Sequence, residues 1–334
     1  MELSNHKEKD KNKLNEIKTF LVPFDLEYKN NIINNNVQMI SKEYKNKIIN
    51  QAFKFHKAGN ISKAEKYYRY LINQGFTDYR VFDNYAIILK SHGNLKKAEL
   101  FTRKAIELKT NNAASYSNLG NILSELGKLK EAEFYIRQAI KIQPNFADAH
   151  TNLAIIMKDL GNLREAEILQ RKAIELKPDC ADSYLNLGNL LFDLGKFNEG
   201  ELATRKAIEL KSDYVEAYLT LGLVLRSLGK FNEAELATKK AIELKSDYVE
   251  AYLNLGNLLN DLGRFHEAEL ATKKAIELKS DYSEAYANLG YIMRNKGDLN
   301  KPLEYAKKLI SIKPWSIIGE YCCNHRMKLN SSHN

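Results

Sequence analysis

The chain repeats itself every 34 residues, and this internal repetition restricts its fold more than any other feature. Residues 215–248 and 249–282 differ at only seven of 34 positions. The same frame extends in both directions without insertion or deletion and divides the sequence into eight repeats: 45–78, 79–112, 113–146, 147–180, 181–214, 215–248, 249–282 and 283–316. Because so short a unit cannot bury its own apolar face, the repeats are predicted to stack in a row.

Each repeat has the pattern of a helical hairpin. A glycine occupies repeat position 15 in all eight repeats, and it suits the left-handed residue that ends a helix. Apolar or small residues precede it with helical spacing at positions 4, 7, 8 and 11: Tyr252, Leu255, Gly256 and Leu259 in the seventh repeat. A second apolar pattern follows it: Ala268, Leu270, Ala271, Ala275, Ile276 and Leu278. The sequence therefore predicts a helix A, a tight turn and a helix B in each repeat.

Small residues recur where the two helices are expected to touch. Position 8 is Gly or Ala in every repeat, and position 20 is mostly Ala. Two helices approach to about 8 Å only where the residues between them are small. Gly200 and Pro302 depart from the pattern at position 20, and Pro302 is tolerable because it falls in the first turn of a helix.

These features together resemble the tetratricopeptide repeat: an aromatic residue, Leu-Gly, a second Gly, two alanines and sometimes a closing proline, with a 34-residue period. The resemblance covers residues 45–316. The sequence of these repeats is similar to that of bacterial repeat arrays, such as those of marine cyanobacteria. It implies an all-α, right-handed superhelical solenoid whose helices A line a concave groove that binds a protein or peptide. Position 24, commonly aromatic in the family, is polar in the middle repeats, so the packing there is expected to differ: Gln170, Thr204, Thr238 and Thr272.

Asparagine recurs at position 6, where the resemblance implies a side chain in the groove. Seven of the eight repeats carry it, and Thr220 interrupts the run: Asn50, Asn84, Asn118, Asn152, Asn186, Asn254 and Asn288. Position 9 adds Asn121, Asn189 and Asn257. Carboxamides match the N–H and C=O groups of an extended peptide, and the run resembles the asparagine ladder in the repeats of O-linked N-acetylglucosamine transferase. Two interpretations stay open, a peptide-binding ladder or an ordinary polar position, and both place Asn152, Asn186 and Asn254 in solvent.

Acidic residues are predicted to line the edge of this groove at position 13: Glu125, Asp159, Asp193 and Asp261. They favour a partner segment that is basic or rich in amides, in an extended or helical conformation. The acids at position 2 are interpreted instead as complements of the helix dipole: Asp148, Asp182, Glu216, Glu250 and Glu284.

The net charge of +9 raises the possibility of nucleic-acid binding, but its distribution argues against it. Basic residues of helix B alternate with acids, as in Glu201–Arg205–Glu209, which is typical of a solvated helix face. No phosphate loop, nucleophile elbow or H-E-x-x-H motif occurs, and adjacent Cys322 and Cys323 beside His325 suit tetrahedral metal coordination poorly. We therefore expect no catalytic residue, cofactor or metal, and no enzyme activity.

The remaining features concern location and the chain ends. Three cysteines form no disulfide framework, no apolar leader is apparent, and no apolar run approaches the roughly 18 residues of a membrane span. These observations favour a cytoplasmic protein without membrane contact. Residues 1–44 are expected to be disordered or weakly ordered. Residues 317–334 are expected to form a cap or tail, with Trp315 and Tyr321 covering the last repeat.

The favoured function is a scaffold for protein–protein interaction. The alternatives are an accessory or targeting component of a glycosyltransferase or sulfotransferase system that acts in trans, or a truncated relic of a larger transferase. The sequence leaves the oligomeric state open.

Overall fold

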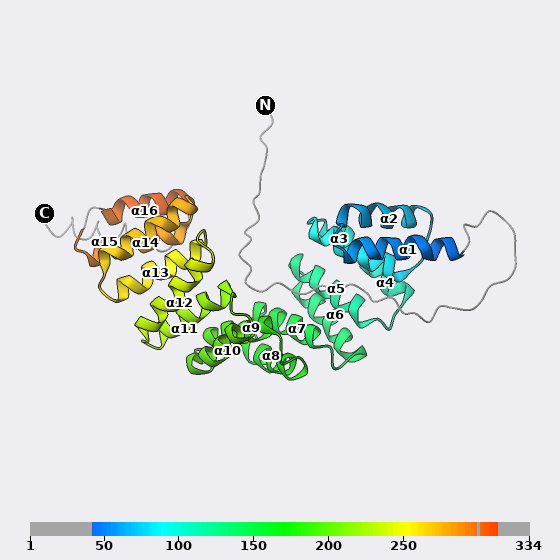
Figure 1. The fold of residues 1–334 in the computed structure, drawn as a ribbon, viewed down its shortest axis with the longest axis horizontal. Helices are drawn as coiled ribbons and strands as arrows, with labels where there is room; N and C mark the ends of the chain where they lie inside the picture. The colour runs from blue at the N-terminus through cyan, green and yellow to red at the C-terminus, as the bar shows by residue number, and fades with distance from the viewer. Residues whose placement is uncertain (1–41, 299–300, 313–334) are drawn as a thin grey trace, which may run out of the picture. The chain divides into compact units, whose positions relative to one another are not determined.

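The computed structural model describes residues 42–298 and 301–312, and all regular structure within them is α-helical (Figure 1). The helices A of the eight repeats are α1 (Lys42–Lys57), α3 (Tyr79–Ser91), α5 (Ala113–Glu125), α7 (Ala147–Asp159), α9 (Ala181–Asp193), α11 (Val215–Ser227), α13 (Val249–Asp261) and α15 (Ser283–Asn295). The helices B are α2 (Ile61–Asn73), α4 (Leu95–Leu108), α6 (Leu129–Ile142), α8 (Leu163–Leu176), α10 (Phe197–Leu210), α12 (Phe231–Leu244), α14 (Phe265–Leu278) and α16 (Lys301–Ile312). The predicted all-α helical solenoid of tandem hairpins is confirmed.

Some predictions concern residues outside this part of the chain. The predicted roles of residues 1–41, of Trp315 and of Tyr321 all lie beyond the described residues. The first helix begins at Lys42, three residues before the first predicted repeat. None of the described helices is long and apolar enough to cross a bilayer.

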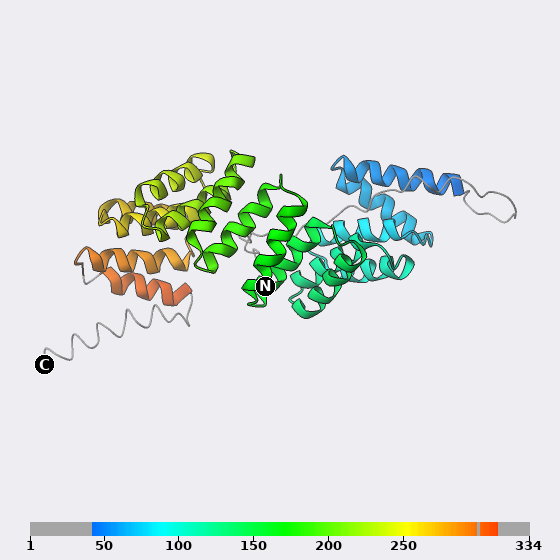
Figure 2. The ribbon, with the colours of Figure 1, turned by 90° about the horizontal axis from the view of Figure 1, so that it is seen from below.

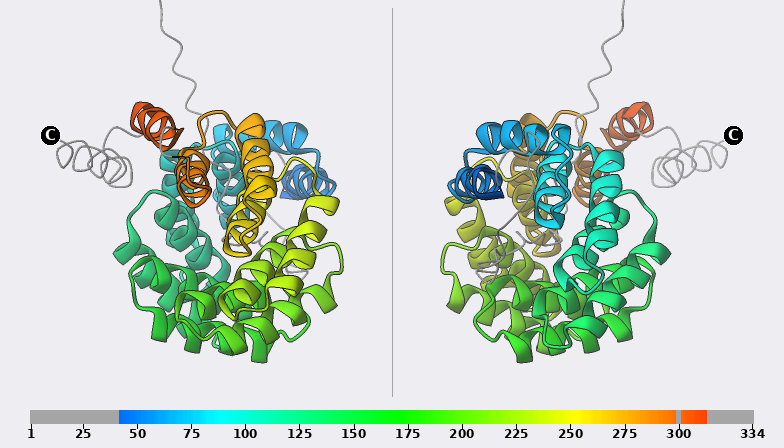
Figure 3. Two further views of the ribbon diagram at one scale, coloured as in Figure 1. Left: turned by 90° about the vertical axis from the view of Figure 1, so that its left-hand side faces the viewer. Right: turned by 90° about the vertical axis from the view of Figure 1, so that its right-hand side faces the viewer.

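The chain divides into two compact units, residues 1–178 and 179–334, and each is considered by itself. The first contains α1–α8 and the second α9–α16. Within each unit, the two helices of a hairpin pack against each other, and each hairpin packs against the next (Figures 2 and 3). The core is therefore a row of small clusters, such as the one that Leu221, Leu225 and Leu258 form between the sixth and seventh repeats.

The turn glycines adopt the left-handed conformation that the sequence predicts. Their φ angles run from +71° at Gly195 to +86° at Gly297. In the third repeat, the Lys128 amide donates to the Leu123 carbonyl at 2.9 Å, and the Gly127 amide donates to the Ser124 carbonyl at 2.9 Å. These bonds satisfy carbonyls that the end of α5 would otherwise leave unpaired, so they fix the direction of α6.

Small residues hold the two helices of a hairpin close together. Ala234 and Ala268 at position 20 are fully buried. A Cβ atom on Gly222 would collide with the Thr238 hydroxyl and lie 3.4 Å from the Ala234 carbonyl oxygen. That hydroxyl donates to the Ala234 carbonyl at 2.8 Å, so the polar residue at position 24 is satisfied by its own helix. The packing at position 24 therefore differs from that of the family. In this repeat a threonine at position 24 contacts a glycine at position 8, whereas the family commonly has an aromatic residue at position 24.

Two residues of the apolar pattern of helix B are exposed. Leu270 is 55% exposed and Leu278 is 37% exposed. Leu270 comes two residues after the buried Ala268, which turns it about 200° around the helix and away from α13. Leu270 therefore lies outside the buried face of α14, although its apolar type fits the helical pattern.

Candidate functional site

The helices A form a continuous row within each unit, called here the helix-A row. Helix α5 contacts α3 and α7 in the first unit, and α11 contacts α9 and α13 in the second. This row carries all of the asparagines predicted to bind a partner.

In the first unit, three of the position-6 asparagines are buried, which contradicts the expectation of a solvent-facing ladder. Asn84, Asn118 and Asn152 are at most 2% exposed, whereas Asn50 is exposed. Asn84 hydrogen-bonds to the Tyr68 hydroxyl of the preceding repeat. The Nδ2 atom of Asn152 donates to the Ser117 hydroxyl of the preceding repeat at 3.3 Å. Buried amides need such partners, so Asn84 and Asn152 join consecutive repeats. Asn121, at position 9, is also buried.

In the second unit, the same positions divide into paired and available side chains. Asn288 is buried and donates to the Thr272 hydroxyl at 3.2 Å, and Thr220 donates to Asn189 at 2.8 Å. Asn186, Asn254 and Asn257 are half-buried, and their amides form no hydrogen bond within the described part of the chain. These three amides, from α9 and α13, are therefore the ones available to a partner.

The position-13 acids are exposed, as expected, and ion pairs neutralise at least Glu125 and Asp261. The Lys90 ammonium lies 2.7 Å from the Glu125 carboxylate, and the Arg226 guanidinium lies 2.5 Å from the Asp261 carboxylate. Both cations stand at position 12 of the preceding repeat. Asp159 and Asp193 are exposed as well. The ion pairs weaken the argument for a basic partner at Glu125 and Asp261.

One acid of the first unit has an unusual environment that its sequence position did not reveal. Asp83 is fully buried on α3 and accepts a hydrogen bond from Ser115 on α5, while its Oδ1 atom has no partner among the described residues. Burial raises the pKa of Asp83 to about 7, and the bond from Ser115 opposes this rise. Asp83 stands at position 5, which carries an apolar or small residue in most of the other repeats. A carboxylate at this position is the feature of the sequence that could have indicated its unusual environment.

The acids at position 2 have at least one clear structural role. The Tyr214 hydroxyl, at the end of the fifth repeat, donates to the Asp182 carboxylate at 2.9 Å. Burial raises the pKa of Tyr214, and the neighbouring carboxylate of Asp182 raises it further. Asp182 also lies in the first turn of α9, where a negative charge is favourable.

The helix-B side carries an ion-pair ladder between repeats. Glu201 accepts from Arg205 at 2.9 Å and from Lys230 of the next repeat at 2.8 Å. Burial alone would raise the pKa of Glu201, but these two cations outweigh burial and lower it. Glu209 pairs with Lys206 of the same helix at 2.6 Å and not with Arg205, so Glu201–Arg205 is the pair of the predicted Glu201–Arg205–Glu209 series that forms.

A row of exposed apolar residues on the helices B was missed. Position 22 of the six internal repeats carries a large apolar side chain that is between 51% and 71% exposed, and we call these residues the outer apolar row: Leu100, Phe134 and Ile168 in the first unit, and Leu202, Leu236 and Leu270 in the second. The first and last repeats have Lys66 and Glu304 there. Apolar surface in register across repeats is typical of an interaction surface. The sequence could have indicated this exposure, because position 22 lies beside positions 21 and 25 on the helix, which carry charged residues in most repeats.

The described residues contain no cluster of three or more His, Cys, Asp or Glu side chains that could hold a metal. The Nε2 atom of His150 lies 2.8 Å from the Pro144 carbonyl oxygen, which fits a packing role. Cys322, Cys323 and His325 lie outside the described residues.

Comparisons with known proteins agree with the repeat pattern. Models of the tetratricopeptide repeat match residues 113–146, 135–168, 181–214, 249–282 and 283–314, and a model described as a TPR repeat matches residues 222–263. No curated protein matches the chain.

Solved structures show the same fold at low sequence identity. The crystal structure of the APC/C hetero-tetramer Cut9-Hcn1 is 16% identical with a TM-score of 0.63, and the match covers 79% of this chain and 52% of that one. The chain thus spans about half the length of that protein. A tetratricopeptide repeat protein from Parabacteroides merdae is 19% identical with a TM-score of 0.58, covering 75% and 98%. Pseudomonas aeruginosa pilF is 20% identical with a TM-score of 0.54, covering 64% and 97%.

The matched segments extend over more than half of the chain, and four of them begin at the first residue of a 34-residue repeat: 113–146, 181–214, 249–282 and 283–314. This chain belongs to the tetratricopeptide repeat family.

Proposed function

We propose that the protein is a scaffold that holds an extended segment of a partner protein along the helix-A row of its second unit. Membership of the tetratricopeptide repeat family supports a protein-interaction role in general, since such repeats are typically non-catalytic scaffolds. The observation that carries the finer proposal is the division of the asparagines. Asn186, Asn254 and Asn257 keep their amides available, whereas Asn288 and Asn189 are hydrogen-bonded within the unit.

An exposed carboxamide offers one acceptor and two donor hydrogens, which pair with the backbone of an extended chain. Packed helices are about 10 Å apart, and a strand rises about 3.3 Å per residue. The fifth and seventh repeats, which carry these amides, would therefore meet residues of the partner that are roughly six apart. Because Arg226 neutralises Asp261, recognition rests on amide hydrogen bonds more than on charge.

The test compares capture of proteins from a lysate of the source organism by three forms of the full chain. The first is wild type, the second carries Asn254→Ala and Asn257→Ala, and the third carries Leu236→Gln and Leu270→Gln on the outer apolar row. Each lost hydrogen bond costs about 1 kcal/mol, so the asparagine variant should bind its partner roughly tenfold to a hundredfold more weakly. The leucine variant controls for two simultaneous substitutions.

A protein captured by wild type and by the leucine variant, but lost by the folded asparagine variant, supports the helix-A row. Loss from the leucine variant alone would move binding to the helices B and contradict the proposal. A transferase among the captured proteins would favour the accessory role, and capture of nothing by any form would favour the truncated relic.

A further inference from the structure

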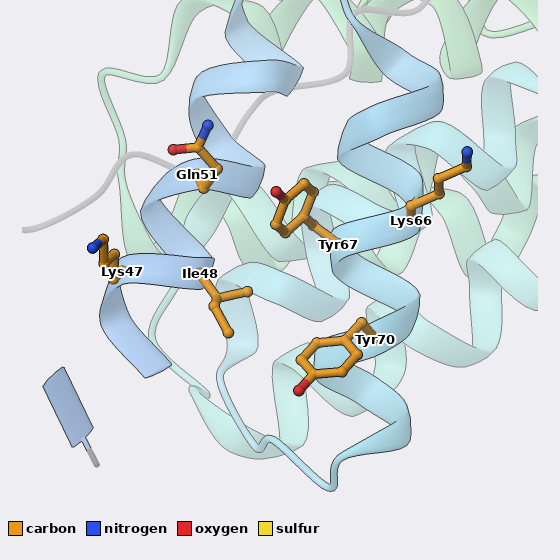
Figure 4. A pocket seen from close by; sticks show the side chains of 6 residues that line it. All are labelled: Lys47, Ile48, Gln51, Lys66, Tyr67 and Tyr70. Carbon is orange, nitrogen blue, oxygen red and sulfur yellow. The ribbon is translucent and has the colours of Figure 1, made fainter. Parts of the chain in front are cut away.

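A recessed surface lies at the first repeat, within the first unit. A cavity of about 600 Å³ opens between α1 and α2, which is within the usual range for ligand sites. Figure 4 shows Ile48 and Tyr67 pointing into the space between the two helices, with Lys47 and Lys66 on either side. Gln51 and Tyr70 complete the lining.

The same repeat positions form a smaller cavity in the sixth repeat. That cavity, of about 240 Å³, includes Tyr218, Leu221, Leu236, Ala237 and Lys240 at positions 4, 7, 22, 23 and 26. Arg205 of the preceding repeat also lines it. The described residues include no hairpin before the first repeat.

The first repeat also changes the chemistry of these positions. Lys66 replaces the apolar residue of position 22, and Tyr67 and Tyr70 stand where the sixth repeat has Ala237 and Lys240. The Tyr67 ring packs at 5.5 Å from the Phe55 ring, which fixes its orientation, whereas Tyr70 is 42% exposed. The cavity therefore has an apolar and aromatic floor with hydroxyl groups at its edge.

The two lysines have no acidic partner among the described residues. An apolar recess lined by two lysines is complementary to an apolar side chain flanked by carboxylates.

We propose that this cavity is a second binding site, which takes an acidic peptide segment of a partner protein with one aromatic or large aliphatic side chain. The apolar side chain lies between Ile48 and Tyr67, and the carboxylates of the segment meet Lys47 and Lys66. The Gln51 amide and the Tyr70 hydroxyl supply hydrogen bonds. This site differs in charge preference from the amide-lined helix-A row, so one scaffold would hold two chemically different segments.

The experiment uses the full chain and fluorescence anisotropy. The probes are a fluorescein-labelled acidic peptide with one central phenylalanine, the same peptide with glycine in place of that phenylalanine, and a lysine-rich peptide of equal length. The variants are Lys66→Glu, Tyr70→Ala and the charge-matched control Lys274→Glu, which changes an exposed lysine of α14. All are exposed positions, so circular dichroism melts should match wild type.

The proposal expects the acidic phenylalanine peptide to bind wild type, and the other two peptides to bind about tenfold more weakly or less. Lys66→Glu should weaken binding at least about tenfold, Tyr70→Ala about threefold to tenfold, and Lys274→Glu not at all. The variant Asn254→Ala/Asn257→Ala should bind this peptide normally, which separates this site from the helix-A row. Absence of binding, equal loss with Lys274→Glu, or a dimer of the chain that Lys66→Glu dissociates would overturn the proposal.

Discussion

Asn254 and Asn288 share a residue type, a repeat position and neighbouring repeats, but they lie in different environments. Asn288 is 6% exposed and donates to the hydroxyl of Thr272, which is itself fully buried. Asn254 is half-buried, and its amide bonds to no other described residue. The substitution of each by alanine therefore isolates the contribution of the hydrogen bond between repeats.

Asn288→Ala removes the donor and leaves the Thr272 hydroxyl oxygen with an unfilled acceptor site in a buried position. A lost hydrogen bond of this kind costs about 1–2 kcal/mol of unfolding free energy. A unit of this size loses roughly 2–4 °C of Tm per kcal/mol, so a fall of about 2–8 °C is expected. Asn254→Ala should change the free energy by less than about 0.5 kcal/mol, because alanine also has the higher helix propensity.

Urea titration of both variants, followed by far-ultraviolet circular dichroism, measures the difference directly. Hydrogen exchange of peptides from α14 and α15 checks that any loss is local to the seventh and eighth repeats, since repeat arrays can unfold in parts. Equal destabilisation by the two substitutions, or a neutral Asn288→Ala, would refute the claim that Asn288 joins these repeats.

Gly200→Ala should raise the unfolding free energy by about 0.5–1 kcal/mol in urea, because its nearest side-chain and backbone atoms leave 3.5–3.7 Å for a methyl group and alanine suits a helix. Gly229→Ala should lower it by about 1 kcal/mol, because the φ angle there is +74°. The hydrogen bond from Lys273 lowers the pKa of Glu269 below its ordinary 4.5 against the opposing effect of burial, so its stabilisation is present above about pH 4.5 and is lost as the pH falls through the lowered pKa. Glu269→Gln should accordingly flatten the acid limb of a stability-against-pH curve. Leu236→Gln should leave Tm within about 2 °C, because Leu236 is 69% exposed, while reducing binding to a hydrophobic-interaction column.

The repeat period and the turns could be predicted from sequence because each depends on local chemistry. A glycine at φ +73°, such as Gly263, is required wherever the hairpin turns, and alanines at position 20 are required wherever two helices meet closely. These requirements recur in every repeat, so the sequence displays them many times over.

The burial of the asparagines could not be predicted, because it depends on side-chain pairing between repeats. Asn254 follows Thr238 as Asn288 follows Thr272, yet only the second pair is hydrogen-bonded. Similarly, Asn152 finds a partner in Ser117 at position 5, where most other repeats have an apolar or small residue. A triple substitution of Asn152, Asn186 and Asn254 would therefore mix a structural change at Asn152 with changes at two available amides.

The exposure of the outer apolar row, in contrast, could have been predicted from the sequence. Position 22 is apolar in six repeats, and Leu270 was included in the apolar pattern of helix B by its residue type alone. Its angle from position 20, about 200°, was sufficient to place it on the far side of helix B. The ion pairs beside it, such as Arg205 with Glu233 at 2.6 Å, connect consecutive repeats and leave Leu202 and Leu236 uncovered.

Photo-crosslinking shows whether a partner lies along the helix-A row of the second unit. The photoreactive residue p-benzoylphenylalanine replaces Asn257 in one sample and Leu236 in another, and each is mixed with the partner identified by capture. We expect a covalent adduct from position 257 and none from position 236. An adduct from position 236 alone would place the partner on the helices B and refute binding along the helix-A row.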